Sequence, residues 1–492
     1  MIMLDYFDSA QPQGEKPIPY DPRTKSEPIM KLIESTALIK KQNERAMSLT
    51  LSNQPEKSAE SNRESEMAWE LLLNDEKIPE DASSFREWNK EITDADPAIE
   101  KDLTRTRTDH PRMRDPATQQ ALREIAAFFC FSNKIEYQQG HLELIAPFLL
   151  SKKEFDTSLC YACFSSFMRK CYSNFLIASN ITESPQLPYL NAALEFCDLM
   201  VQYHIPKVSE VLRTRGIDCR AFALSWIITL FAKGTPISVV YRTFEYYLQR
   251  EDKQFFFYLI VAMLAMSSKD LMKLSWDDDS DNTQLIKYLN HHIKADTLRD
   301  ADCVKYWFEL ADKIKKNTPK SFETHFINLS FQTGAIDNLE VALPYVYPAE
   351  IINFILKKTK KISLRPLARD IQFVILDLRR KKEHGYVPCT VDLPTSIYKS
   401  GDVVVKELLK GQCRSSKDVH FCLMMTGDSD EQENKMGKVV CEELMKSEKN
   451  HVSLLFGGFK GLIEEIAKRK VEIDLQKKEK NFFQKFKRVF GH

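Results

Sequence analysis

The spacing of apolar residues changes along this chain, and that change constrains the fold more than any other feature of the sequence. From Trp69 to Leu289, apolar side chains recur mostly three and four residues apart, as on one face of a helix, and strand-like alternation is scarce. Seven segments carry this pattern: Ala121 to Cys130, Leu142 to Leu150, Ser158 to Tyr172, Leu190 to His204, Ala221 to Lys233, Ser238 to Gln249 and Phe255 to Met266. This region is therefore predicted to be all-helical.

Proline and glycine are expected to separate these helices, because helices commonly stop at such residues. They stand at Pro147, Pro188, Pro206, Gly216, Gly234 and Pro236. From Ala301 to Leu356 the helical spacing continues in shorter and more polar segments, which favours a connector.

A different pattern follows the connector. Short apolar runs typical of buried strands appear at Phe373 to Leu376, Val403 to Val405, Val419 to Met425 and Val452 to Leu455. Helical stretches such as Glu433 to Ser447 separate them. Alternating strands and helices predict a small α/β domain with a parallel sheet.

The predicted fold class is thus multidomain, with an all-α domain followed by a small α/β domain. Residues 1–60 are rich in Lys, Glu, Ser, Pro and Gln and are expected to be a mostly disordered arm. The expected boundaries are 61–295 for the helical domain, 296–358 for the connector, 359–470 for the α/β domain and 471–492 for a basic, aromatic tail.

Composition excludes several classes of protein. The 492 residues include 70 basic and 70 acidic side chains, so no overall charge attracts nucleic acid. No window approaches the roughly 18 apolar residues of a membrane span, and Met1 to Asp8 lacks the layout of a signal peptide. The 11 cysteines lie mostly in apolar stretches, which suits reduced thiols in a cytoplasmic protein.

Two short segments carry the residues best suited to chemistry. The first runs from Asp102 to Thr106 and is followed by His110-Pro111, and the second is Tyr137 to Gly140. Arg105 offers a planar guanidinium that stays charged when water is excluded, and Gln139 offers a donor and an acceptor on one amide. Read singly, Arg105 could equally be half of an exposed ion pair and Gln139 a helix terminus.

Taken together, the two segments resemble the signature of TBC-domain GTPase-activating proteins for Rab GTPases. The residues that carry the resemblance are Ile99, Asp102, Arg105, Thr106, His110, Pro111, Tyr137, Gln139 and Gly140, continued by Ile145-Ala146-Pro147 and Phe222 to Trp226. The resemblance implies that Arg105 and Gln139 act in trans on the GTP of a bound Rab. It also implies supporting roles for Asp102, Tyr137 and Gly140.

Further segments resemble the TBC domain family member 23 subgroup, which carries a rhodanese-like domain after its TBC domain. They are Val201 to His204, Ala221 to Ala232 and Tyr246 to Met263, with Asp377 to Arg379, Gly385 to Pro388 and Gly457 to Phe459 in the α/β region. This resemblance implies vesicle-mediated transport from endosomes to the Golgi, peripheral at the trans-Golgi network. Members of the subgroup have often lost the residues that correspond to Arg105 and Gln139, and they serve as adaptors. A non-catalytic adaptor that tethers vesicles to golgins is therefore the alternative function.

The rhodanese-like domain is expected to be inactive, and no metal or cofactor is expected. Sulfur transfer needs a thiolate in the loop after a central strand, and the loop from Thr426 to Glu433 contains no cysteine and four carboxylates. Cys422 belongs to the strand itself. Cys160 and Cys163 have the spacing of metal ligands, but without a second pair they are better interpreted as two positions on one core helix.

The basic tail has two interpretations. Lys485, Phe486, Lys487 and Phe490 could lie on an acidic membrane, with the rings in the interface and the charges near the lipid headgroups. The same pattern suits a frayed helix that packs one or two rings against its own domain.

Overall fold

The computed structural model describes most of the chain beyond residue 68. The described residues are 69–88, 97–152, 154–172, 188–250, 252–274, 282–330, 343–360, 371–380, 385–392, 419–427, 430–446, 451–471 and 473. The predicted arm, the strand at Val403 to Val405 and the membrane-binding residues Lys485, Phe486, Lys487 and Phe490 lie outside them.

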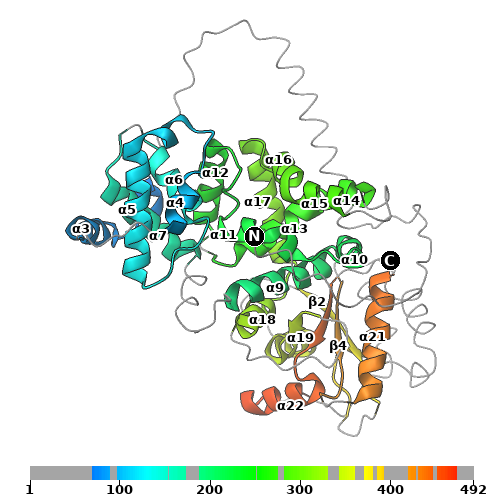
Figure 1. The fold of residues 1–492 in the computed structure, drawn as a ribbon. Helices are drawn as coiled ribbons and strands as arrows, with labels where there is room; N and C mark the ends of the chain where they lie inside the picture. Colours follow the sequence, from blue (N-terminus) through cyan, green and yellow to red (C-terminus); the bar gives the residue numbers. More distant parts are fainter. Residues whose placement is uncertain are drawn as a thin grey trace, which may run out of the picture.

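The described residues up to Thr297 form helices and the turns between them, as their apolar spacing predicts (Figure 1). Its elements are α2 (Trp69–Leu73), α3 (Ile78–Glu87), α4 (Pro97–Leu103), η2 (Pro111–Arg114), α5 (Pro116–Asn133), α6 (His141–Leu150), α7 (Thr157–Phe167), η3 (Met168–Tyr172), α9 (Pro188–His204), α10 (Pro206–Thr214), η5 (Cys219–Ala221), α11 (Ala223–Ile228), α12 (Ile237–Leu248), α13 (Phe255–Met266), α14 (Ser268–Leu274), α15 (Thr283–Lys287), η6 (Tyr288–His292) and α16 (Ile293–Thr297).

Helix α13 lies at the centre of this bundle. Its sequence is apolar on every side, and every residue from Phe255 to Ala265 is buried, as expected for a helix enclosed by others. It packs against α9, α16 and α17 (Ala301–Lys316). Trp307 of α17 donates its indole N–H to the carbonyl of Leu259 over 2.8 Å, which satisfies the one polar atom of a buried ring.

Several of the prolines expected to separate helices do so by starting the next helix. Pro188 and Pro206 are the first residues of α9 and α10, and Pro236 immediately precedes α12, where the missing N–H costs nothing. The expectation for Pro147 is wrong, because α6 continues through it to Leu150. All ten residues of α6 are buried, so packing outweighs the loss of one backbone hydrogen bond.

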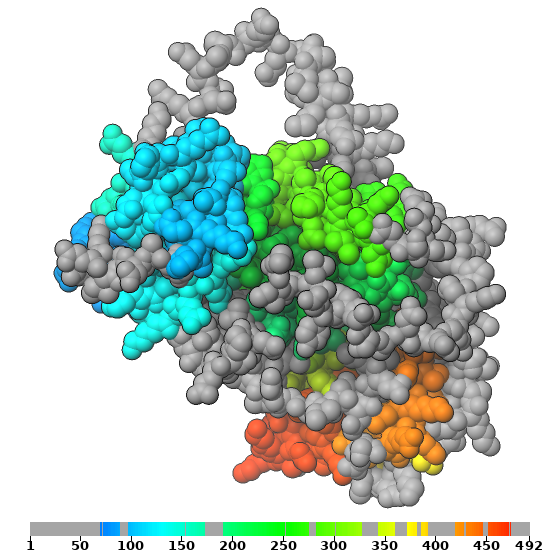
Figure 2. Space-filling model, viewed as in Figure 1, coloured from blue at the N-terminus to red at the C-terminus, as the bar shows by residue number. Residues whose placement is uncertain are grey.

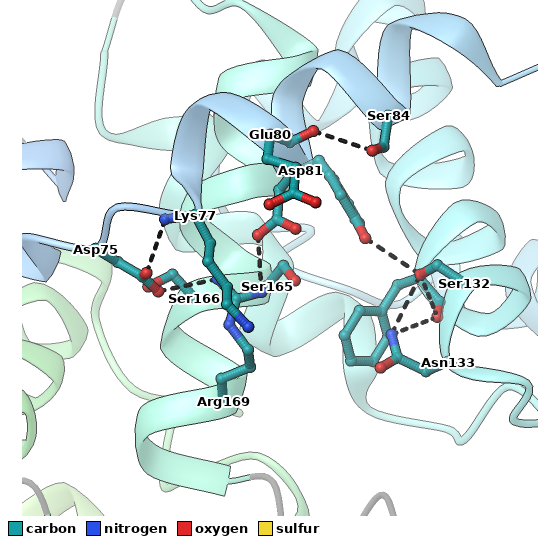
Figure 3. Close-up of polar contacts among 12 residues, drawn as sticks. Asp75, Lys77, Glu80, Asp81, Ser84, Ser132, Asn133, Ser165, Ser166 and Arg169 are labelled. Atoms are coloured by element: carbon teal, nitrogen blue, oxygen red, sulfur yellow. Dashed lines mark hydrogen bonds and ion pairs between the residues drawn. The ribbon is translucent and has the colours of Figure 1, made fainter.

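Polar contacts hold the first helices against α7. Arg169 of η3 donates to Asp81 over 2.7 Å and to Asp75 over 2.9 Å, and Figure 3 shows these groups between α3 and the end of α7. Ser166 donates to the same carboxylate of Asp75 over 2.5 Å. The turn between α2 and α3 is therefore fixed to the end of α7.

The C-terminal region contains a five-stranded parallel sheet, as predicted. Its elements are α18 (Ser321–Ser330), β1 (Tyr345–Val346), α19 (Pro348–Lys360), β2 (Gln372–Asp377), β3 (Thr390–Asp392), β4 (Val419–Met424), α21 (Glu431–Lys446), β5 (Val452–Leu455) and α22 (Gly458–Arg469). The strand order is β1-β5-β4-β2-β3, with every pair parallel. Strand β1 lies within the residues assigned above to the connector, because two residues are too short a run to be recognised.

Helices cover both faces of this sheet, which is why its strands are apolar on both sides. Val374 and Leu376 of β2 face the cluster that includes α21, whereas Phe373 and Ile375 face α19 and α22. The apolar cluster on the side of α19 and α22 continues without interruption into the core of the helical bundle. The sheet is therefore packed onto the bundle rather than separated from it.

The contact between the bundle and the sheet contains several buried histidines. The backbone N–H of His451 donates to the carbonyl of Tyr203 at the end of α9 over 2.8 Å. The ring of His420 in β4 stacks on that of His451 with centroids 4.3 Å apart, and it also bonds the hydroxyl of Tyr203. His204 bonds Thr318 over 2.9 Å.

None of the described helices alone combines the length and apolar composition of a membrane span. The pair α13 and α14, bent by 60° at their junction, meets that criterion jointly by length and composition.

Candidate functional site

The carboxylate of Asp102 joins the two segments that the sequence analysis selected. Asp102 is buried on the last turn of α4, and its Oδ1 lies 2.9 Å from Nε of Arg105. Its Oδ2 accepts the hydroxyl of Tyr137 over 2.7 Å and the backbone N–H of Gly140 over 2.8 Å. One side chain thus binds the arginine on one side and the turn containing Gln139 on the other.

The backbone of Asp102 also shapes the loop that carries Arg105. Its carbonyl accepts the N–H of Arg105 over 3.2 Å and that of Thr106 over 3.0 Å. The hydroxyl of Thr106 donates to the same carbonyl over 2.8 Å. The chain therefore leaves α4 in a tight turn that brings Arg105 back over Asp102.

The Arg105 side chain remains at the surface. It is 41% exposed, whereas the side chain of Asp102 is 7% exposed. Among the described residues, the two terminal nitrogens of Arg105 make no hydrogen bond, so both can donate to an external acceptor. A guanidinium held at Nε and open at its outer edge is suited to binding phosphate oxygens.

Gln139 lies on the other side of Asp102 and is exposed. The next residue, Gly140, precedes α6 with φ of 106°, a conformation that side chains rarely adopt. A Cβ at Gly140 would lie 3.1 Å from methyl groups of both Ile228 and Thr229. Glycine is therefore required here by both conformation and space.

Two rings support this turn, the half-buried ring of Tyr137 and the buried ring of His141. Burial and the bond to Asp102 raise the pKa of Tyr137, so its hydroxyl remains a donor. Its ring contacts that of His141, with centroids 5.7 Å apart. Burial lowers the pKa of His141 to about 4, so this imidazole is neutral at pH 7.

Comparison with known families decides what this helical scaffold is. Residues 63–272 match the family described as the Rab-GTPase-TBC domain. Residues 63–272 are a TBC domain. The matched range contains Asp102, Arg105, Tyr137, Gln139 and Gly140, and it ends before the sheet.

Curated relatives share this part of the chain. The chain is 22% identical over 256 residues to Rab GTPase-activating protein eat-17 of Caenorhabditis elegans, a match covering 52% of this chain and 27% of the relative. It is 21% identical over 254 residues to the human ecotropic viral integration site 5 protein homolog, covering 51% and 30%. A human TBC domain-containing protein kinase-like protein is 26% identical over 151 residues, covering 30% and 16%. The chain thus spans less than a third of the length of each.

Two solved structures are also similar. The Ypt/Rab-GAP domain of Gyp1p matches with 16% identity and a TM-score of 0.41, covering 50% of this chain and 85% of that domain. The Chlamydomonas flagellar RabGAP TBC domain matches with 15% identity and a TM-score of 0.37, covering 60% and 97%.

The TBC domain contains a buried ionic group that the sequence analysis missed. Arg107, two residues after Arg105, has Nε 2.9 Å from Oε2 of Glu143 on α6, and both side chains are at most 8% exposed. This contact is an ion pair, whereas the hydrogen bonds of Arg107 go to the carbonyls of Ala232, over 2.6 Å, and Thr235. Glu143 gave a signal in the sequence, because it is the one charged residue in a long apolar segment and such a charge needs a partner.

Lys294 of α16 completes this buried group. Its ammonium donates to the carbonyl of Lys233, in the same turn that Arg107 contacts. Burial and the nearby positive charge of Arg107 lower the pKa of Lys294 to about 7. Burial raises the pKa of Glu143, although Arg107 opposes that shift.

The part of the chain that the structure describes contains no group of three or more His, Cys, Asp or Glu side chains that could hold a metal ion. Cys160 and Cys163 are buried on α7, and burial raises the pKa of each thiol to about 12. Both belong to the core of the TBC domain.

Proposed function

We propose that this chain is a GTPase-activating protein that acts in trans on a GTP-bound Rab GTPase, with Arg105 and Gln139 entering its nucleotide site. The observation that carries the proposal is the position of Asp102, which binds Arg105 and the turn of Gln139 with its two oxygens. Both candidate side chains are exposed on either side of this buried carboxylate. The match to the Rab-GTPase-TBC domain family supports the same partner.

The chemistry follows from what limits GTP hydrolysis. Negative charge spreads over the transferred phosphoryl group, and the attacking water must be held in line. The open edge of Arg105 can neutralise that charge, and the amide of Gln139 can accept from and donate to the water. An arginine supplied in trans accelerates such hydrolysis by roughly 10³ to 10⁵.

Single-turnover GTP hydrolysis by a panel of Rab GTPases, with the full chain added, tests this proposal. For any responsive Rab, Arg105→Ala should lower the stimulated rate by at least roughly 10³ and Gln139→Ala should also lower it. Arg242→Ala is the matched control, because Arg242 is half exposed and pairs with Glu245 three residues away at 2.7 Å, on α12. A panel in which no Rab responds would reject catalysis and leave the adaptor function.

We also propose that the sheet region is a rhodanese-like module without catalysis. The loop after β4 contains no cysteine, and Cys422 is buried within the strand, where its pKa is raised to about 12. The carboxylate of Glu433 accepts the N–H of Thr426 over 2.8 Å and that of Arg380 over 2.9 Å. Backbone donors that could bind an anionic substrate are therefore already paired with the protein's own carboxylate.

The cellular setting of this activity is proposed from resemblance. Similarity to the TBC domain family member 23 subgroup favours traffic from endosomes to the trans-Golgi network. The alternative from the same source is an adaptor that binds golgin tethers. Binding of a golgin fragment by the Arg105→Ala variant, with hydrolysis lost, would show that the two functions coexist.

A further inference from the structure

A second connection, separate from Asp102, links the loop of Arg105 to the helix that follows Gln139. Arg107 stands two residues after Arg105, and Glu143 stands four residues after Gln139 on the first turn of α6. Their side chains meet 2.9 Å apart beneath the surface. A buried ion pair is therefore formed by residues that closely follow the two exposed candidate residues, Arg105 and Gln139, in the sequence.

The backbone at Arg107 is held in an unfavourable conformation. Its φ is 50°, in the left-handed region that residues other than glycine and asparagine seldom occupy. Strain of this kind persists only where surrounding contacts impose it, and it concentrates at functional sites. Here the contacts are Glu143 and the two carbonyls of the turn after α11.

The hydrogen bonds to that turn fix the orientation of the Arg107 guanidinium. A guanidinium presents its donors in a rigid fork, so simultaneous bonds to Ala232 and Thr235 fix the plane of Arg107 as well as its depth. Lys294 of α16 donates to the carbonyl of Lys233 in the same turn, so a second side chain holds that turn. Arg107 thereby ties the chain just after Arg105 to two elements, α6 and the turn after α11.

We propose that Arg107 and Glu143 are a positioning pair that sets the direction in which Arg105 projects toward the bound GTPase. This inference rests on the proposed function. Arg107 and Glu143 touch no reacting atom, since both are buried. Their contribution is to catalytic geometry, and misplacement of a reacting group by about 1 Å costs on the order of 100-fold in rate.

Replacing both partners separates positioning from stability. Arg107→Met alone leaves Glu143 buried without its partner, so it should lower both the unfolding free energy and the rate. The double variant Arg107→Met, Glu143→Met exchanges the pair for apolar side chains, a change that is often neutral for stability. It should recover the part of the lost stability that comes from the unpaired charge of Glu143, while the saturating single-turnover rate stays about 10- to 100-fold below that of the unaltered chain.

A second variant and a second kinetic measurement serve as controls for this test. Arg107→Lys keeps the charge beside Glu143 but loses the fork, and it should lower the saturating rate with little change in the concentration giving half-maximal rate. Recovery of the full rate in the double variant, while Arg105→Ala remains impaired, would overturn the positioning role. If Arg105→Ala were also without effect, the proposed function itself would fail.

Discussion

At the scale of single residues, the site depends on a few side chains whose partners come from distant parts of the sequence. Asp102 is the clearest case, because three donors from two segments meet on one buried carboxylate. Such a group is bound by charge-assisted hydrogen bonds, which contribute more than neutral ones. Replacing Asp102 should therefore affect both stability and catalysis.

Asp102→Asn should weaken both the fold and the activity. An amide supplies one acceptor oxygen in place of two and points N–H groups at one of the donors, so we expect a loss of about 1 to 3 kcal/mol in unfolding free energy. The rate of stimulated hydrolysis should fall as well, because Arg105 loses its anchor. Urea unfolding and single-turnover hydrolysis measure the two effects.

The matched control is Glu100→Gln, two residues earlier on α4. Glu100 pairs with Arg123, but both side chains are about a third or more exposed, so this change should cost less than about 1 kcal/mol. Equal losses from the two substitutions would contradict the special role of Asp102.

Gly140→Ala should destabilise the turn before α6. The alanine would have to keep a φ of 106°, and its methyl group would lie 3.1 Å from two side-chain methyls. We therefore expect a loss of at least about 2 kcal/mol in unfolding free energy. Gly216→Ala is the control, since Gly216 also has a positive φ, of 65°, but nothing within 4 Å of the added Cβ. A smaller loss at Gly140 than at Gly216 would refute this account of the turn.

At the scale of elements, the sequence predicts the parts whose burial gives a long and regular signal. Helices α5, α6, α7, α9, α12 and α13 and strands β2, β4 and β5 coincide with the predicted apolar runs, whereas the run from Ala221 to Lys233 forms only the shorter helix α11. Strands β1 and β3, of two and three residues, do not, because such short runs have no measurable period. Their place in the sheet is set by pairing with β5 and β2.

The same limit applies to the site. Arg105 and Gln139 could be selected because residues of the right type stand at a recognisable spacing. The contact of Arg107 with Glu143 and with the turn at Ala232 could not, because it joins residues up to 128 positions apart and depends on how helices pack. Sequence spacing determines which residues share a helix face, whereas contacts between helices follow from the whole core.

The link between β4 and α21 gives a prediction at this scale. Glu433 is buried in the first turn of α21, and its carboxylate accepts the N–H and the hydroxyl of Thr426, each over 2.8 Å. Glu433→Ala should lower the unfolding free energy by about 2 to 3 kcal/mol, because buried donors lose their partner. Glu431→Ala, at an exposed position two residues earlier, should change it by less than about 0.5 kcal/mol in the same urea unfolding experiment. Similar values for both would contradict the role of Glu433.

At the scale of the whole molecule, the TBC domain and the sheet share one core. A single apolar cluster extends from Trp69 of α2 to Leu462 of α22. The histidines of their contact are buried. Figure 2 shows the green helices lying between the blue-to-cyan helices and the orange and red ones. The stability of the two regions should therefore be linked.

Acidification tests that linkage. Burial lowers the pKa of His451 to about 3 and that of His325 to about 4, and burial together with neighbouring histidines places the pKa values of His204 and His420 well below the usual range. Below the unfolded pKa of about 6.5 the unfolded chain binds more protons, so stability falls as the pH falls. Each buried histidine should cost about 1.4 kcal/mol between pH 7.5 and 5.5.

The variant His451→Asn isolates one of these groups. His451 has φ of 67°, and asparagine tolerates that conformation without titrating. Its unfolding free energy should fall by about 1.4 kcal/mol less than that of the unaltered chain over the same pH interval. An identical pH dependence in both proteins would mean that His451 is not buried as a neutral group.

The most direct test of the central claim is binding to a GTPase held near its transition state. The claim is that Arg105 and Gln139 stabilise the reacting phosphoryl group rather than the bound GTPase in general. The affinity of the full chain should be at least about 100-fold higher for a responsive Rab loaded with GDP and aluminium fluoride than for the same Rab loaded with GDP alone. Arg105→Ala should abolish that preference while Arg242→Ala retains it. Equal affinity for the two loaded states would contradict the account.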